Sequence, residues 1–282
     1  FLVLFVITKY FDHSERKHKK TWRRMVGKFP RPPGHHLAEK VSDRSFTITG
    51  MMLGFAFCPI FIFGIVPNIE ALAGWLLTFI TQGVILWKFI PIISQHQNDK
   101  KGMMAEIKVG MALSSKLPNS CSVYHDVQLA EEGRHGANAD HVVVTPHEIY
   151  LIDTKYCRAA KEADSNELFY DGSRIRLGKE GYAGDQDLQS IQSVKQQLVN
   201  YLQREGGIKV DIPIRCVLIY PGWKVDFTEA MGKNAAVQVS ATTALINRLV
   251  RKHSSTSIIE GSTADRIDQL LDAKNVVRLE KF

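Results

Sequence analysis

The sequence contains few cysteines, and none is placed for a metal centre or a disulfide framework. Its four cysteines are widely spread, with no CxxC pair and no nearby histidine pair at zinc spacing. We therefore expect neither a structural zinc site nor disulfide bonds. Free thiols of this kind fit a reducing compartment.

The chain also lacks an internal repeat and a phosphate-binding loop. The stretch GKEG at 178–181 does not end in the GK[ST] of a strand-loop-helix, so it is not a nucleotide-binding P-loop. The sequence starts at Phe1 rather than Met, as expected of a fragment or a processed product. A cleaved signal peptide does not fit, because the order of charge and apolar run is wrong.

Acidic residues are scarce in one region, residues 9–44. It holds eleven lysines and arginines against four acids, which accounts for the whole net charge of +7 and leaves the remainder near neutral. Such a segment suits contact with anionic lipid or a nucleic-acid arm. Beside a membrane span, the lipid and topology role is the simpler interpretation.

Charge is absent over residues 51–67 and nearly absent over residues 71–93, where only Lys88 is charged. Each stretch is close to the roughly 20 residues that cross a bilayer, and two tryptophans lie towards the ends of the second. The link between them is long enough only for a tight turn. The rest of the chain offers no core large enough to bury two such helices, so we expect a transmembrane helical hairpin.

Basic residues flank both open ends of this hairpin, with residues 9–44 before it and Lys100 and Lys101 after it. The positive-inside rule then places both flanks in the cytoplasm and residues 68–70 at the outer surface. We therefore expect a multi-pass protein of the inner or plasma membrane whose soluble domain is cytoplasmic.

The composition divides the chain into five parts. We expect an apolar tail and basic cytoplasmic segment at 1–46, the transmembrane hairpin at 47–94, a linker at 95–102, a soluble domain at 103–250 and a C-terminal helical extension at 251–282.

Helical and extended patterns alternate in the soluble part. The periodicity predicts helices at 103–116, 185–204, 241–250 and 263–273, strands at 121–129, 139–146, 149–157, 212–221 and 236–240, and a small hairpin at 167–178. This order is typical of an α/β fold with a mixed sheet flanked by helices.

Charged residues lie at the ends of two of these apolar strands. Asp140 begins one strand, while Asp153 and Lys155 are two residues apart on the next and so share a face. If the two strands form a hairpin, Asp140 lies opposite residue 153 or 154. Two carboxylates at this spacing suit a hard divalent cation, above all Mg²⁺. A lysine beside them can activate a water or offset charge on a phosphate oxygen, which predicts metal-assisted phosphodiester hydrolysis.

Two histidines, His125 and His141, each stand next to an aspartate and are further candidates for a metal ligand. His141 follows Asp140 and is expected to face away from the site as a packed strand residue. His125 and Asp126 are expected on the surface rather than as a metal pair.

The stretches KGMMAEIKVGMAL, YHDVQL, ADHVVVTPHEIYLIDTK and DQDLQSIQSVKQQL resemble the NERD (nuclease-related) domain of the PD-(D/E)xK nuclease superfamily. The resemblance covers about residues 102–250 and implies a restriction-endonuclease-like fold. It implies a metal held by Glu106, Asp140 and Asp153. Lys155 would then orient the water or stabilise the pentavalent state, and Gln189 would position the substrate or a metal water.

The chain departs from the family pattern at two points. Asp153 stands where Glu is common, and the Asn-Pro that often precedes the family's glutamine is absent. The register of the helix is therefore open, and Gln192, Gln196 and Gln197 stay alternatives to Gln189.

The resemblance implies a membrane-anchored nuclease that cleaves DNA with Mg²⁺, with Mn²⁺ as an alternative and RNA left open as a substrate. A homodimer and partners in a membrane complex are further expectations. Two other classes stay open: an inactive module that binds nucleic acid or protein, and a scaffold subunit of a membrane complex, for example in DNA transfer.

Overall fold

The computed structural model describes residues 30–65, 70–129, 138–157, 167–177, 182–183, 185–208, 212–227, 236–252 and 259–275. The apolar start of the chain, most of the basic segment and nearly all of the expected hairpin turn lie outside these residues. The described chain forms two compact units, one of residues 36–101 and one of residues 30–35 with 102–275.

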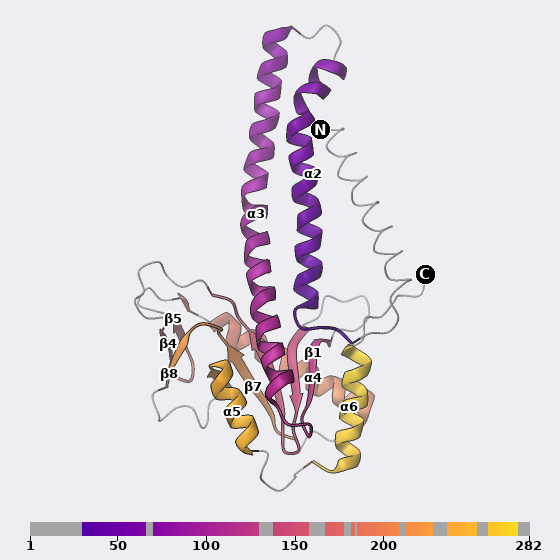
Figure 1. Cartoon of the computed structure of the whole chain (residues 1–282), viewed down its shortest axis with the longest axis vertical. Helices are drawn as coiled ribbons and strands as arrows, with labels where there is room; N and C mark the ends of the chain where they lie inside the picture. The colour runs from indigo at the N-terminus through magenta and orange to yellow at the C-terminus, as the bar shows by residue number, and fades with distance from the viewer. Residues whose placement is uncertain are drawn as a thin grey trace. The chain divides into compact units, whose positions relative to one another are not determined.

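Two long helices, α2 (His35–Ile65) and α3 (Ala71–Lys116), lie side by side in the first unit (Figure 1). The amide of Gln82 on α3 donates a hydrogen bond to the carbonyl oxygen of Phe55 on α2 at 3.3 Å. The ring of Phe63 packs edge-on against Trp75. Arg44 of α2 and Asp99 of α3 form an ion pair between the two helices.

Both helices are long and apolar enough to cross a membrane. A core helix of a soluble protein would bury its apolar side chains, whereas these helices leave large ones exposed: Phe57, Ile60, Leu76, Phe79, Ile80, Trp87 and Ile90. Each helix also contains an internal proline, which membrane helices tolerate.

The expected linker at 95–102 is helical, because α3 runs without a break to Lys116. The stretch QHQNDKKG is polar but contains no proline, and most of its residues are compatible with a helix. Polarity alone therefore did not mark a break in the chain.

The second unit contains a five-stranded sheet in the order β1-β2-β3-β7-β9. Its first three strands are antiparallel and the last three run parallel, so the sheet is mixed. These strands are β1 (Ser122–Gln128), β2 (Asn138–Val144), β3 (Ile149–Thr154), β7 (Ile214–Ile219) and β9 (Val237–Ser240).

A smaller sheet has the order β6-β5-β4-β8. Its strands are β4 (Glu167–Tyr170), β5 (Ile175–Leu177), β6 (Tyr182–Ala183) and β8 (Lys224–Phe227). Tyr170 ties it to the larger sheet, because its hydroxyl donates a hydrogen bond to the carbonyl oxygen of Val237 at 2.7 Å.

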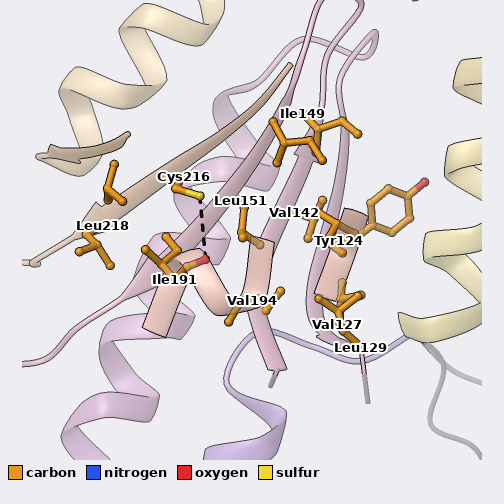
Figure 2. Packing of buried hydrophobic residues seen from close by; sticks show 14 of the residues in the cluster. Tyr124, Val127, Leu129, Val142, Ile149, Leu151, Ile191, Val194, Cys216 and Leu218 are labelled. Atoms are coloured by element: carbon orange, nitrogen blue, oxygen red, sulfur yellow. Dashed lines mark hydrogen bonds between the residues drawn. The ribbon is translucent and has the colours of Figure 1, made fainter. Parts of the chain in front are cut away.

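Helices cover both faces of the larger sheet. One face packs against α4 (Asp185–Gly206) and α6 (Gly261–Asn275), and Figure 2 shows this core, in which the thiol of Cys216 lies 3.9 Å from the carbonyl oxygen of Ile191. The opposite face packs against the end of α3 and α5 (Thr242–Lys252). The predicted fold class, α/β with a mixed sheet flanked by helices, is confirmed.

Residues 30–34, which precede α2, pack on the second unit and are called the strap here. The backbone N–H of Arg31 donates a hydrogen bond to the carbonyl oxygen of Asn275 at 2.7 Å. A Cβ on Gly110 of α3 would lie 2.5 Å from the Cβ of Pro33, so only glycine admits the strap at this point. The turn-rich PRPPG stretch is thus a packed part of this unit.

Candidate active site

The hairpin of β2 and β3 brings two predicted acids together. His141 pairs with Ile152, so the next position along places Asp140 beside Asp153. The backbone N–H of Thr154 donates a hydrogen bond to Oδ2 of Asp140 at 2.7 Å. The hairpin predicted from the alternating pattern is confirmed, with Asp140 opposite residue 153.

Lys155 completes this edge of the sheet. Its Nζ lies 2.9 Å from Oδ2 of Asp153. Its backbone N–H donates a hydrogen bond to the carbonyl oxygen of Ile219 at 2.9 Å, which fixes the end of β3 against β7. The two side chains therefore lie on the same face, as their spacing predicts.

Glu106 on α3 is buried and lies close enough to act on Asp140. Loss of hydration raises the pKa of Asp140 well above its ordinary value, and the carboxyl groups of Asp153 and Glu106 raise it further. The N–H of Thr154 opposes this shift. Three carboxyl groups thus crowd together, and negative charge is costly at Asp140.

The same carboxylates act on Lys155 with the opposite sign. Burial disfavours its ammonium group, but the charges of Asp153, Asp140 and Asp187 outweigh burial and raise the pKa of Lys155. The lysine therefore stays a cation at neutral pH, as electrostatic stabilisation of a phosphate requires.

Two residues of this site had not been predicted from the sequence. Asp187 lies in the first turn of α4, with its Oδ1 4.0 Å from Nζ of Lys155. The hydroxyl of Tyr220 donates a hydrogen bond to its Oδ2 at 2.7 Å. A signal was available for Asp187, because it belongs to the DQDLQ stretch from which Gln189 was chosen.

Gln189 lies on the exposed side of α4, while its neighbour Leu188 is buried in the core. The alternatives Gln192 and Gln196 are also exposed, and Gln197 is half-buried. The α4 residue that reaches the lysine is Asp187, so a role for any of these glutamines stays a prediction.

The expectation of a surface position for His125 and Asp126 was wrong. Both are buried, and Asp126 adopts a φ of 52°. It occupies the register position opposite Asp140, between the pairs that flank it on β1 and β2. Its Oδ2 lies 3.1 Å from Nη1 of Arg31, and Asn138 donates a hydrogen bond to its Oδ1. The ion pair with Arg31 of the strap and the hydrogen bond from Asn138 offset the energetic cost of burying this carboxylate.

His141 lies on the face opposite Asp140, as its position in the strand predicts. Its Nδ1 is 2.9 Å from Nδ1 of His125, whose Nε2 is 2.9 Å from Oγ of Ser114. Burial lowers the pKa of His125 to about 4, and burial and His125 together lower the pKa of His141. Both imidazoles are therefore neutral near pH 7.

Glu106, Asp140 and Asp153 supply the hard oxygen ligands that Mg²⁺ or Mn²⁺ prefers. In the part of the chain that the structure describes, no three His, Cys, Asp or Glu side chains already surround a common point at ligand distances. The carboxylates would therefore close on a cation by side-chain movement. The crowding that raises the pKa of Asp140 favours such binding, because a cation relieves it.

Comparison with known proteins gives one match. Residues 101–221 match the family model of the NERD domain, described as a nuclease-related domain. No curated protein and no solved structure matches the chain. The matched segment runs from the end of α3 to just beyond β7, and it includes the acids and the lysine described above.

Proposed function

Because residues 101–221 carry a nuclease-related NERD domain, we propose that the chain is a membrane-anchored nuclease that hydrolyses DNA phosphodiester bonds with Mg²⁺. The observation that carries this proposal is the meeting of Asp140, Asp153 and Lys155 at one edge of the sheet. Glu106 adds a third carboxylate from α3.

Each residue has a part in this chemistry. Glu106, Asp140 and Asp153 would hold the ion, which when bound supplies a Lewis acid and a water of lowered pKa. The N–H of Thr154 fixes the carboxylate of Asp140. Lys155, kept cationic by its carboxylate neighbours, offsets the negative charge that grows on the phosphate oxygens.

The strap supports a hairpin topology in the membrane. Residues 30–34 precede α2 but contact Gly110, near the end of α3, and Asn275, which follows α3. These contacts require both flanks of the helix pair to lie in one compartment. If α2 crosses a membrane, α3 must therefore cross back, which agrees with basic residues on both flanks.

A reporter at the C-terminus tests this topology in whole cells. We expect a cytoplasmic signal, since the C-terminal part shares the compartment of the strap. A C-terminal reporter found outside the cytoplasm would overturn the topology and leave a DNA substrate without access to the site.

Cleavage assays of the full chain in lipid nanodiscs test the activity. We expect cleavage of single- or double-stranded DNA with Mg²⁺ or Mn²⁺ and none with a chelator, and RNA serves as a further substrate. Asp153→Ala should lower the rate by more than the roughly 10–100-fold cost of losing a group that only supports a ligand. Asp265→Ala, which removes an exposed aspartate on α6, is the matched control and should cleave normally.

The outcomes separate the function classes. Metal-dependent cleavage that survives Asp153→Ala would rule out the proposed site. Salt-sensitive DNA binding without cleavage would favour an inactive binding module, and neither activity would favour a scaffold subunit. The same preparations report whether the chain forms a homodimer, which a nuclease that cuts both strands would use.

A further inference from the structure

Lys155 lies between two carboxylates that have different surroundings. Asp153 is 2.9 Å from its Nζ and sits on β3 among the proposed metal ligands. Asp187 is 4.0 Å from the same Nζ and belongs to α4. The ammonium group is thus held from two elements of the fold.

The proposed function places two demands on Asp153. It would bind a divalent cation and would also hold Lys155. Two positive charges that share a carboxylate repel each other at this short distance. When Asp153 turns to a metal, Lys155 therefore needs another anion to keep its place.

Asp187 is fixed in a way that suits this role. Its Oδ2 accepts a hydrogen bond at 2.7 Å from the hydroxyl of Tyr220, and the Tyr220 side chain is fully buried. The carboxylate is thereby held, with its Oδ1 directed to the lysine.

The end of β7 holds both ends of this arrangement. The carbonyl oxygen of Ile219 accepts the backbone N–H of Lys155, and Tyr220 is the next residue along the chain. One short segment therefore fixes the main chain of the lysine and the carboxylate that faces its ammonium group.

We propose that Asp187 and Tyr220 are positioning residues that keep the ammonium group of Lys155 in place when Asp153 engages a metal. This inference deepens the proposed function and depends on it. The simpler alternative is that Asp187 only stabilises the start of α4, where an acid interacts favourably with the helix dipole. That role would affect folding but would not couple Asp187 to Lys155.

A labelling experiment separates the two roles without any need for cleavage. The full chain in nanodiscs is treated with formaldehyde and a mild borohydride, and mass spectrometry measures the rate of methylation at Lys155. Asp153→Asn mimics an Asp153 that has let go of the lysine. The variants are Asp153→Asn, Asp187→Asn and their combination, with Ser193→Ala as an exposed α4 control.

We expect each single change to accelerate labelling modestly, because one carboxylate still holds the ammonium group. The double change should accelerate it at least about threefold beyond the product of the single effects, as coupled partners of one group do. Tyr220→Phe should act like a weaker Asp187→Asn, and Asp187→Glu should restore slow labelling. Ser193→Ala should leave the rate unchanged.

The kinetic counterpart is a fall in kcat of about 10–100-fold for Asp187→Asn with KM nearly unchanged, because the lysine acts on the charge that develops in the transition state. Labelling rates that simply multiply would overturn the positioning role. Absence of metal-dependent cleavage by the unaltered chain would instead overturn the proposed function, and the labelling result would still stand. If Asp187→Asn fails to fold, Tyr220→Phe carries the same test.

Discussion

Two buried polar groups of the larger sheet handle charge in opposite ways: the acidic row, which is Asp126, Asp140 and Asp153, and the histidine pair, which is His125 and His141. Asp126, Asp140 and Asp153 occupy adjacent register positions on three strands. His141 faces α3 and pairs with His125. The acidic row keeps its charges beside two cations, whereas the histidine pair is neutral near pH 7.

A cation lies beside the aspartate at each end of the acidic row. Arg31 pairs with Asp126, and Lys155 pairs with Asp153, which leaves Asp140 between them with a raised pKa. For the histidine pair, burial instead lowers the pKa of both imidazoles. A fold keeps buried charge at such a cost mainly where chemistry uses it, so the contrast favours the acidic row over the histidine pair as the functional group.

The largest effect on this contrast should come from removing one of the two cations beside the acidic row. Arg31→Ala leaves the carboxylate of Asp126, whose side chain is 1% exposed, without its ion partner. We expect the free energy of unfolding to fall by about 3–5 kcal/mol, the usual cost of orphaning a buried charge. Denaturant titration of the second unit's tryptophan signal in detergent measures it.

Two controls accompany this change. Arg174→Ala removes an exposed arginine of the smaller sheet and should shift stability by less than about 0.5 kcal/mol. Asp126→Asn combined with Arg31→Ala should recover part of the loss, because no buried charge then remains. Equal stability of Arg31→Ala and the unaltered chain would show that the strap does not stabilise the buried carboxylate of Asp126.

A smaller effect, a change in how stability depends on pH, should come from the histidine pair. The pKa of His125 in the folded chain is about 4, below the value near 6.5 of an unfolded histidine. As pH falls, the unfolded chain binds the proton first. This histidine's contribution to stability is therefore complete above about pH 6.5, is lost as pH falls towards 4, and is constant below that.

The expected slope is about 1.4 kcal/mol per pH unit for each histidine that titrates in this window. His125→Gln should flatten the dependence on pH relative to the unaltered chain, and denaturant titrations at several pH values between 4 and 7 measure the difference. The comparison is needed because Asp140, with its raised pKa, contributes a slope of the opposite sign. An unaltered slope in His125→Gln would contradict burial of a neutral imidazole pair.

The features predicted well from the sequence depend on local periodicity. Alternation along two strands and the short turn between them were enough to place Asp140 opposite Asp153 and Lys155 on the same face. Helices of strong amphipathic pattern, such as α4, were found within a few residues of their ends.

The features that were missed depend on distant partners. Asp126 looked like a surface residue because its ion partner lies 95 positions away in the strap. Asp187 was missed because the residues of α4 that reach Lys155 depend on the rotation of the helix at its first turn, which the core contacts of Leu188 and Ile191 determine. The polar stretch at 95–102 looked like a linker because hydropathy does not distinguish an exposed helix from a loop.

The strap also sets the order in which the molecule can be completed. Arg31 precedes both long helices, and its backbone partner Asn275 lies near the end of the described chain. A ribosome therefore releases the last contact of the second unit only after α2 and α3 have been made, and folding of that unit must wait for this long-range closure. Newly made protein would thus hold an incomplete second unit until Arg31 and Asn275 have met.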